Sequence, residues 1–135
     1  MRIVVDTNIL ISALISPGNI PDQLYQLWLD KKFGLVTSQW QIAELRRVSR
    51  YDGVKKYLKT HEVGHLVNSL REKALILEDL PTVSYSPDPD DNPILAAGIA
   101  GEVHFIVSGD KSDILELQVV QGIPIVTARA FVELL

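Results

Sequence analysis

Cysteine is absent from the 135-residue chain, which therefore has neither disulfide bridges nor thiolate ligands for a metal ion. Long hydrophobic runs are absent too, since no stretch approaches the roughly 18 consecutive apolar residues that a membrane-spanning helix requires. The first residues, MRIVVD, are typical of a strand and lack the basic and apolar regions of a secretory signal. We therefore expect a soluble protein of the cytoplasm.

Positive charge is in slight deficit, because 17 acidic and 13 basic residues give a formal net charge of −4. This balance argues weakly against a broad surface for nucleic acid. The basic residues are nevertheless concentrated in one stretch, where only Asp52 opposes them: Arg46, Arg47, Arg50, Lys55, Lys56 and Lys59. Such a run is typical of a solvated helix face, and the alternative is a patch that contacts phosphate groups.

Hydrophobic residues make up 47% and charged residues 22% of the chain, as in a globular protein, and its length is that of one domain. Short apolar runs rich in β-branched residues predict strands over residues 2–7, 33–38, 74–79, 104–110 and 123–127. Apolar residues at helical spacing predict helices over 8–15, from Pro21 onward, and over 39–59, 61–73, 93–101, 112–122 and 128–135. This alternation predicts a single α/β domain over residues 1–135, with a mainly parallel sheet of about five strands that is covered on both faces.

Acidic residues gather near the carboxyl ends of the predicted strands, where sites form in parallel sheets. They follow the first and fourth strands, precede the helix before the fourth strand, or lie in the helix after the second: Asp6, Asp110, Asp88, Asp90, Asp91 and Glu44. Taken singly, an Asp in such a place is as readily explained as a helix cap, and Glu44 as a surface residue.

Taken together, these carboxylates predict a cation site. Each pair at about 5 Å in an effective dielectric near 20 repels by roughly 3 kcal/mol, and a hard cation would relieve that repulsion. Ligands that are all oxygen, without cysteine or histidine, suit Mg²⁺ or Mn²⁺. These ions activate water and neutralise the charge that develops during phosphodiester hydrolysis, so the pattern favours phosphoryl chemistry.

Four segments resemble the PIN-domain family in their order and spacing: VVDTNILISAL, the IAEL helix around Glu44, DPDDNPILAAGIAG and FIVSGDKSDIL. The similarity is to small prokaryotic PIN proteins described as toxin components of toxin–antitoxin modules, and it extends to the closing IPIVTARAFVELL. It implies a three-layer α/β/α fold and an endoribonuclease that uses Mg²⁺ or Mn²⁺ to cut single-stranded RNA. The partners it implies are a cognate antitoxin protein and a second copy of the chain.

The resemblance also implies roles for individual residues. Asp6, Glu44, Asp91 and Asp110 match the acidic set around the metal, where they would be catalytic residues and ligands. Asn8 matches the polar residue that helps to position the site.

The register within residues 88–91 stays open at this point. Asp91 is preferred because it stands three residues before Ile94 at the helix start, but the family's pattern is interrupted there, and Asp88 is the alternative ligand. Asp113 is expected to cap the next helix, with an outer role at the metal as the alternative. The basic stretch supplies the expected RNA contacts: Arg46, Arg47 and Arg50.

Two other interpretations compete with a nuclease. The segment HEVGH at residues 61–65 matches the H-E-x-x-H motif of zinc proteases, but Gly64 weakens the helix and no third ligand stands out downstream. A non-catalytic PIN-like module that binds RNA or a protein is the stronger alternative. The intact Asp6, Asp91 and Asp110 argue against it, because a pure binding module has no need of them.

Overall fold

The computed structural model of the protein describes residues 1–109 and 113–135. Its centre is a six-stranded sheet in the order β3-β2-β1-β4-β6-β5. The strands are β1 (Arg2–Val5), β2 (Gly34–Ser38), β3 (Leu75–Leu77), β4 (Phe105–Ser108), β5 (Val119–Val120) and β6 (Ile123–Thr127). Neighbouring strands pair in parallel, except that β5 pairs with β6 in the antiparallel direction. The mainly parallel sheet is therefore confirmed, with β5 as an additional strand.

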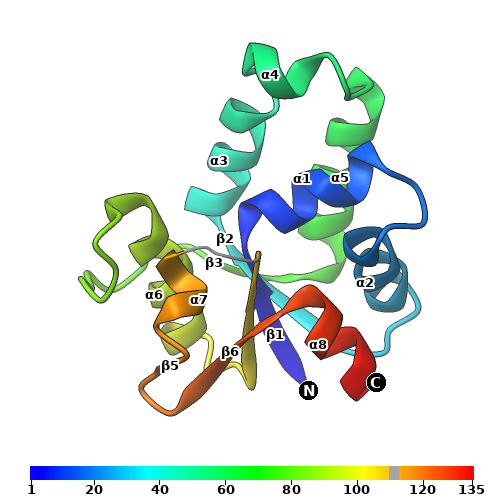
Figure 1. Ribbon diagram of the computed structural model, residues 1–135. Helices are drawn as coiled ribbons and strands as arrows, with labels where there is room; N and C mark the ends of the chain where they lie inside the picture. Colours follow the sequence, from blue (N-terminus) through cyan, green and yellow to red (C-terminus); the bar gives the residue numbers. More distant parts are fainter. Residues whose placement is uncertain (110–112) are drawn as a thin grey trace.

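Helices connect the strands and cover both faces of the sheet (Figure 1). They are α1 (Thr7–Ile15), α2 (Ile20–Leu29), α3 (Gln39–Val48), α4 (Asp52–Lys55), α5 (Thr60–Lys73), the 3₁₀ helix η1 (Pro89–Asp91), α6 (Asn92–Ala100), α7 (Asp113–Glu116) and α8 (Ala128–Leu134). Residues of α1, α2, α3, α5 and α8 form the core on one face, and residues of α6 and α7 form the core on the other. This is the three-layer α/β/α fold that the resemblance implied. Among the described helices, none combines the length and the apolar character needed to cross a membrane.

The two cores follow from the alternation of side chains along the buried strands. In β1, Ile3 and Val5 pack into the larger core, whereas Val4 between them packs against α6. In β2, Leu35 and Val36 divide in the same way. Because helices cover both faces, the strands are apolar at successive positions, which is why they could be predicted as continuous apolar runs.

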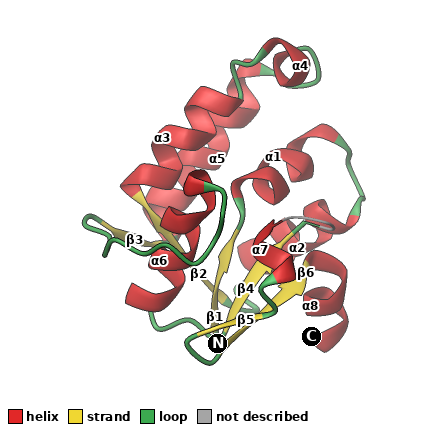
Figure 2. Cartoon of the chain, turned by 60° about the vertical axis from the view of Figure 1, so that its left-hand side comes forward, coloured by secondary structure: helices red, strands yellow, loops and turns green. Residues whose placement is uncertain are grey.

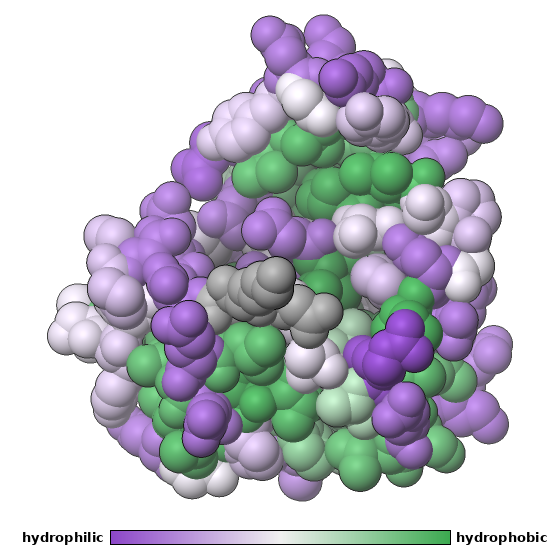
Figure 3. Space-filling model, in the orientation of Figure 1, coloured by the Kyte–Doolittle hydropathy of each residue, from purple (hydrophilic) through white to green (hydrophobic). Residues whose placement is uncertain are grey.

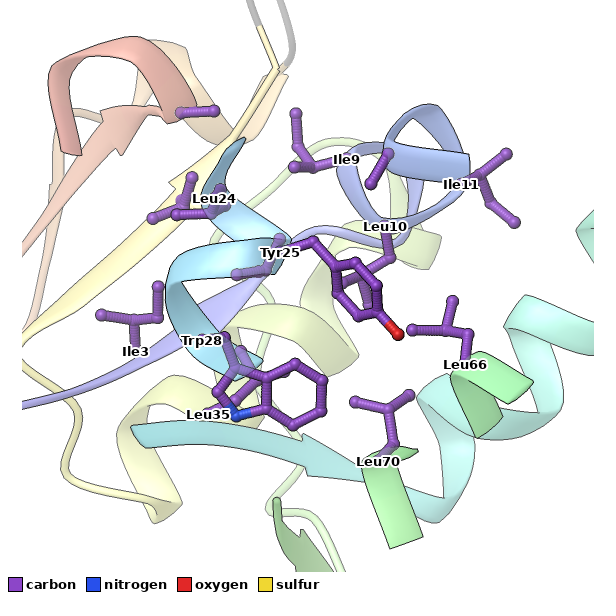
Figure 4. Close-up of a cluster of buried hydrophobic side chains, with 14 of the residues drawn as sticks. Ile3, Ile9, Leu10, Ile11, Leu24, Tyr25, Trp28, Leu35, Leu66 and Leu70 are labelled. Carbon is purple, nitrogen blue, oxygen red and sulfur yellow. The ribbon is translucent and has the colours of Figure 1, made fainter. Parts of the chain in front are cut away.

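Aromatic residues of α2 fill the centre of the larger core. The rings of Tyr25 and Trp28 lie with their centroids 5.8 Å apart, and both side chains are buried. Figure 4 shows these rings directed from α2 toward Leu66 and Leu70 of α5. This packing fixes α5 and α2 to each other beneath α1.

Two glycines let α6 lie very close to the sheet. A Cβ atom at Gly98 would lie 2.7 Å from Ile106 Cδ1, and one at Gly101 would lie 2.8 Å from Val36 Cγ1. Since α6 precedes β4 and runs antiparallel to it, its first turn lies at the carboxyl edge of the sheet. Close packing of α6 therefore positions the acidic segment that precedes it.

Two predicted helices differ from the structure. The helix expected over 39–59 is divided into α3 and α4. The helix expected over 112–122 was wrong beyond α7, because the chain there continues into β5. Gln121 and Gly122, with φ angles of 46° and 79°, form the two-residue turn that joins β5 to β6, a conformation typical of tight hairpins. Pairing with β6 thus outweighs the helical spacing of the apolar residues in this segment.

Candidate active site

The carboxyl edge of the sheet carries an acidic site that starts with Asp6, directly after β1. The backbone N–H of Asp6 donates to the carbonyl of Val107 in β4 at 2.8 Å, and its Oδ2 accepts from Ser108 Oγ at 3.0 Å. Burial raises the pKa of the Asp6 carboxyl; the hydrogen bond from Ser108 opposes this rise, and the charge of Asp88 adds to it. The carboxylate is therefore held between β1 and β4 with its charge only partly compensated.

Glu44 reaches the same edge from α3, with only 11% of its side chain exposed. Its Oε1 accepts a hydrogen bond from the Thr7 hydroxyl, and its Oε2 lies 3.5 Å from Arg47 Nη2. Burial raises the pKa of Glu44, and the charges of Asp6 and Asp90 raise it further, while Thr7 and Arg47 lower it. Glu44 thus shares the negative field around Asp6.

A buried polar chain orients α3 against the end of β1. Thr37 Oγ1 donates to Gln41 Oε1 at 2.5 Å, and Gln41 Nε2 donates to the Val5 carbonyl at 2.7 Å. Gln41 Nε2 also donates, at 3.4 Å, to the hydroxyl of Thr7, the residue that holds Glu44. None of these polar residues was predicted from the sequence, because Thr and Gln at such places have many structural roles. Their position next to the acidic residues was the one available signal.

A set of hydrogen bonds fixes the segment 86–92 before α6. Ser86 Oγ donates to Asp91 Oδ2 at 2.9 Å, and the Ser86 backbone N–H donates to Asn92 Oδ1 at 2.9 Å. Asn92 Nδ2 donates back to the Ser86 carbonyl at 3.3 Å. Asp88 accepts from the backbone N–H of Asp90 at 3.0 Å and so caps η1. Ser86 is thus a positioning residue that no sequence motif revealed.

This arrangement brings Asp88 and Asp91 together with Asp113 at the start of α7, and we call these three residues the aspartate trio. One carboxylate oxygen from each lies within 4.8 Å of those from the other two. Burial raises the pKa of Asp91; the hydrogen bond from Ser86 lowers it, and the charges of Asp88, Asp6 and Asp113 raise it. Asp88 and Asp91, the two alternatives for one ligand position, therefore face the same space.

The remaining residues that the sequence singled out lie outside the aspartate trio. Asn8 is exposed in the first turn of α1, and Asp90 is exposed in η1. Asp110 falls outside the described residues, so its role stays a prediction. His61 and His65 are exposed on α5. Among the described residues, neither histidine lies in a cluster of side chains that could hold a metal ion.

The three arginines expected to contact RNA are divided between two places. Arg47 pairs with Glu44 at the acidic site. Arg46 and Arg50 line a groove between α3, α4 and α5.

The ligand chemistry of the acidic site fits a divalent cation that prefers oxygen. The aspartate trio supplies carboxylate oxygens, and Asp6 and Glu44 add negative charge beside it. The raised pKa values of Asp6, Glu44 and Asp91 reflect burial and repulsion from neighbouring carboxylates, and a bound cation would stabilise their charged forms. In Figure 3, hydrophilic residues gather where α3, α6 and α7 approach one another. The arrangement can therefore hold a divalent metal ion by its donor chemistry.

Comparisons with known proteins agree with this geometry. A family model described as PIN domain matches residues 2–112. An uncharacterized protein of Methanocaldococcus jannaschii is 26% identical over 119 residues, which cover 87% of this chain and 76% of that protein. No solved structure matches the chain significantly.

Proposed function

This chain belongs to the PIN-domain family, and from that premise we propose that it is an endoribonuclease that uses Mg²⁺ or Mn²⁺ to hydrolyse phosphodiester bonds in single-stranded RNA. PIN domains are generally metal-dependent nucleases. The observation that best supports the proposal is the aspartate trio, with its oxygens within 4.8 Å of one another and with Asp6 close enough to raise the pKa of Asp91.

The aspartate trio would hold the ion through one oxygen of each carboxylate. When bound, such an ion makes water more acidic and neutralises charge on the phosphate. The chain's own contribution is orientation: Ser86 aims the Asp91 carboxylate, and Ser108 aims that of Asp6. Thr7 holds Glu44 at the same edge. A hydroxyl donor thus orients each of these three carboxylates, and their negative charge would attract the cation.

Cleavage of a labelled single-stranded RNA by the full chain tests the activity. We expect cleavage with Mg²⁺ or Mn²⁺ and none after addition of EDTA. Asp6→Asn and Asp91→Asn should each lower the rate by about two orders of magnitude or more, because stabilisation of transition-state charge depends on the ion they help to hold. Asp79→Asn, which changes an exposed acid outside the acidic site, is the matched control and should cut as the parent does. RNA that is bound but never cut would support the non-catalytic PIN-like RNA- or protein-binding module instead.

The biological role that we propose is the toxin of a type II toxin–antitoxin module, acting in the cytoplasm, with an antitoxin protein and a second copy of the chain as partners. The resemblance to small prokaryotic PIN proteins supports this role. Expression of the parent should arrest growth, expression of Asp91→Asn should not, and the protein encoded by the adjacent gene should relieve the arrest. Normal growth of cells that contain active nuclease would refute the toxin role.

A further inference from the structure

A groove of about 280 Å³ lies between the end of α3, α4 and the first half of α5. Three cationic residues, Arg46, Arg50 and Lys55, line it together with three apolar residues, Leu58, Val63 and Val67. Figure 2 shows α3 and α5 side by side with α4 beyond their ends, so the groove sits at the tip of a helical projection above the sheet. In Figure 3, hydrophobic surface at this end of the molecule is framed by hydrophilic residues.

Within the described part of the chain, no carboxylate pairs with the positive charges of this groove. Among the described residues, the ion pairs are Arg2 with Glu102 and Arg47 with Glu44, so the three cations of the groove have no carboxylate partner there. Arginine guanidinium groups bind phosphate oxygens through paired donors, whereas an apolar surface takes the face of a base or sugar. Cations beside apolar side chains therefore fit a nucleotide better than they fit a purely apolar ligand.

Two exposed tyrosines flank α4 on the segment that closes the groove. Tyr51 is 52% exposed and Tyr57 is 58% exposed, and Lys56 Nζ lies 5.2 Å from the centre of the Tyr57 ring. Exposed aromatic rings among basic residues are the platforms on which proteins stack the bases of single-stranded nucleic acids. These rings favour an RNA strand over an acidic peptide as the occupant.

We propose that this groove holds one unpaired nucleotide of the RNA, with its phosphate on Arg46, Arg50 and Lys55 and its base against the apolar residues. The identity of the ligand rests on the proposed function. A volume near 280 Å³ is at the small end of ligand sites, which are roughly 300–1,000 Å³, and so suits a single nucleotide. Glu44 and Arg46 both lie in α3, two positions or roughly 3 Å apart along the helix axis, so a short stretch of RNA would connect the groove to the acidic site.

Gly64 offers a test that leaves every charge in place. It lines the groove, and a Cβ atom built there meets nothing within 4 Å, so Gly64→Leu would fill the groove without a clash. Gly53→Leu is the matched control, because Gly53 lies nearby in α4, is equally open, and does not line the groove. Both variants should melt no lower than the parent, since Gly is the weaker helix former.

The measurement is fluorescence anisotropy of a short labelled oligoadenylate in EDTA, where cleavage plays no part. Gly64→Leu should weaken binding about ten-fold or more, and Gly53→Leu should leave it unchanged. The double variant Arg50→Gln/Lys55→Gln should make the plot of log affinity against log salt shallower by about 0.7 for each phosphate that is no longer neutralised. Equal affinity of parent and Gly64→Leu would overturn the proposal.

Cleavage kinetics separate this proposal from the proposed function. If RNA is cut and Gly64→Leu raises KM more than it lowers kcat, the groove is a substrate subsite. If RNA binds in the groove but no divalent ion produces cleavage, the nuclease assignment is wrong and the groove is still a binding site for RNA. If RNA is cut with the same KM in both proteins, the groove is refuted and the nuclease stands. If Gly64→Leu abolishes binding of a Glu- and Leu-rich peptide and leaves RNA affinity intact, the groove belongs to a protein partner and the proposal is overturned.

Discussion

Replacing Asp91 by Asn removes one negative charge from the aspartate trio and keeps the shape of the side chain. Ser86 Oγ, which donates to Asp91 Oδ2 at 2.9 Å, can donate equally to the amide oxygen of an Asn. The hydrogen bonds between Ser86 and Asn92, which fix the turn before α6, involve no atom of Asp91. The substitution therefore changes charge while the supporting structure stays in place.

The size of the effect follows from Coulomb's law. Unit charges at the 4.8 Å limit of the trio repel by about 3.5 kcal/mol in an effective dielectric of 20 and by about 0.9 kcal/mol in bulk water. Asp88 and Asp113 are exposed, so solvent screening places the repulsion of each from Asp91 near the lower value. We expect the metal-free variant to be more stable than the parent by about 1–2 kcal/mol, which corresponds to a rise of about 3–6 °C in Tm for a domain of this length.

Thermal unfolding followed by circular dichroism, with EDTA and with Mn²⁺, measures both states. At a Mn²⁺ concentration about 100 times its Kd, an ion that binds only the folded parent stabilises it by about 2.7 kcal/mol, and the variant gains less because one ligand is weakened. The order of the two melting temperatures should therefore reverse when Mn²⁺ is added, while Asp79→Asn follows the parent throughout. A variant that is less stable without metal, and that responds to Mn²⁺ as the parent does, would refute the reasoning and leave Asp91 a structural residue of the turn.

Three further predictions concern single residues. Because the pKa of Asp6 is raised in the folded state, the folded parent loses stability as this carboxyl deprotonates. Without metal, the Tm of Asp6→Asn should equal that of the parent below the ordinary pKa of 3.8 and should exceed it increasingly as pH rises through the raised value. A Tm difference that is constant across pH would contradict this. Tyr25→Phe should leave the free energy of unfolding in urea unchanged or raise it, since the buried Tyr25 hydroxyl has no hydrogen-bond partner among the described residues; a decrease above about 1 kcal/mol would show that the hydroxyl is satisfied. Gly101→Ala should cost about 1–3 kcal/mol in the same measurement, because its Cβ would lie 2.8 Å from Val36 Cγ1 and 2.9 Å from the Ala97 carbonyl oxygen, whereas a neutral result would show that α6 can move away from the sheet.

The parts of the fold that could be predicted are those with a local signal. β1, β2 and β4 are buried on both faces, so each contains apolar residues at successive positions. The acidic residues that follow β1 or precede α6 lie at one edge by the geometry of parallel sheets. β5 could not be found in this way, because its two residues are a strand only through pairing with β6. The helical spacing that led to the prediction over 112–122 is explained in part by α7, which ends at Glu116 before β5 begins.

The acidic site was predictable in its acids and not in the residues that hold them. Asp6 and Glu44 could be predicted because several carboxylates in one region point to a cation site. Nothing in the sequence distinguishes Ser86 and Ser108 from other serines, and only the structure shows that they donate to Asp91 and Asp6. Asp113 was expected first as a helix cap. Its carboxylate joins the aspartate trio because of where α7 packs, which no short segment of sequence encodes.

Arg47 lies in α3, the helix that contributes residues to both the acidic site and the groove. Its ion pair with Glu44 is 3.5 Å long and its side chain is 55% exposed, so the pair is screened and contributes little to stability. Arg46 and Arg50 turn instead toward the groove, where no described carboxylate pairs with them. A polyanion approaching α3 therefore meets attraction at one end and repulsion at the other. A cation among the carboxylates would offset this repulsion, so on the proposed function RNA should bind the groove without metal, whereas cleavage at the acidic site should require it.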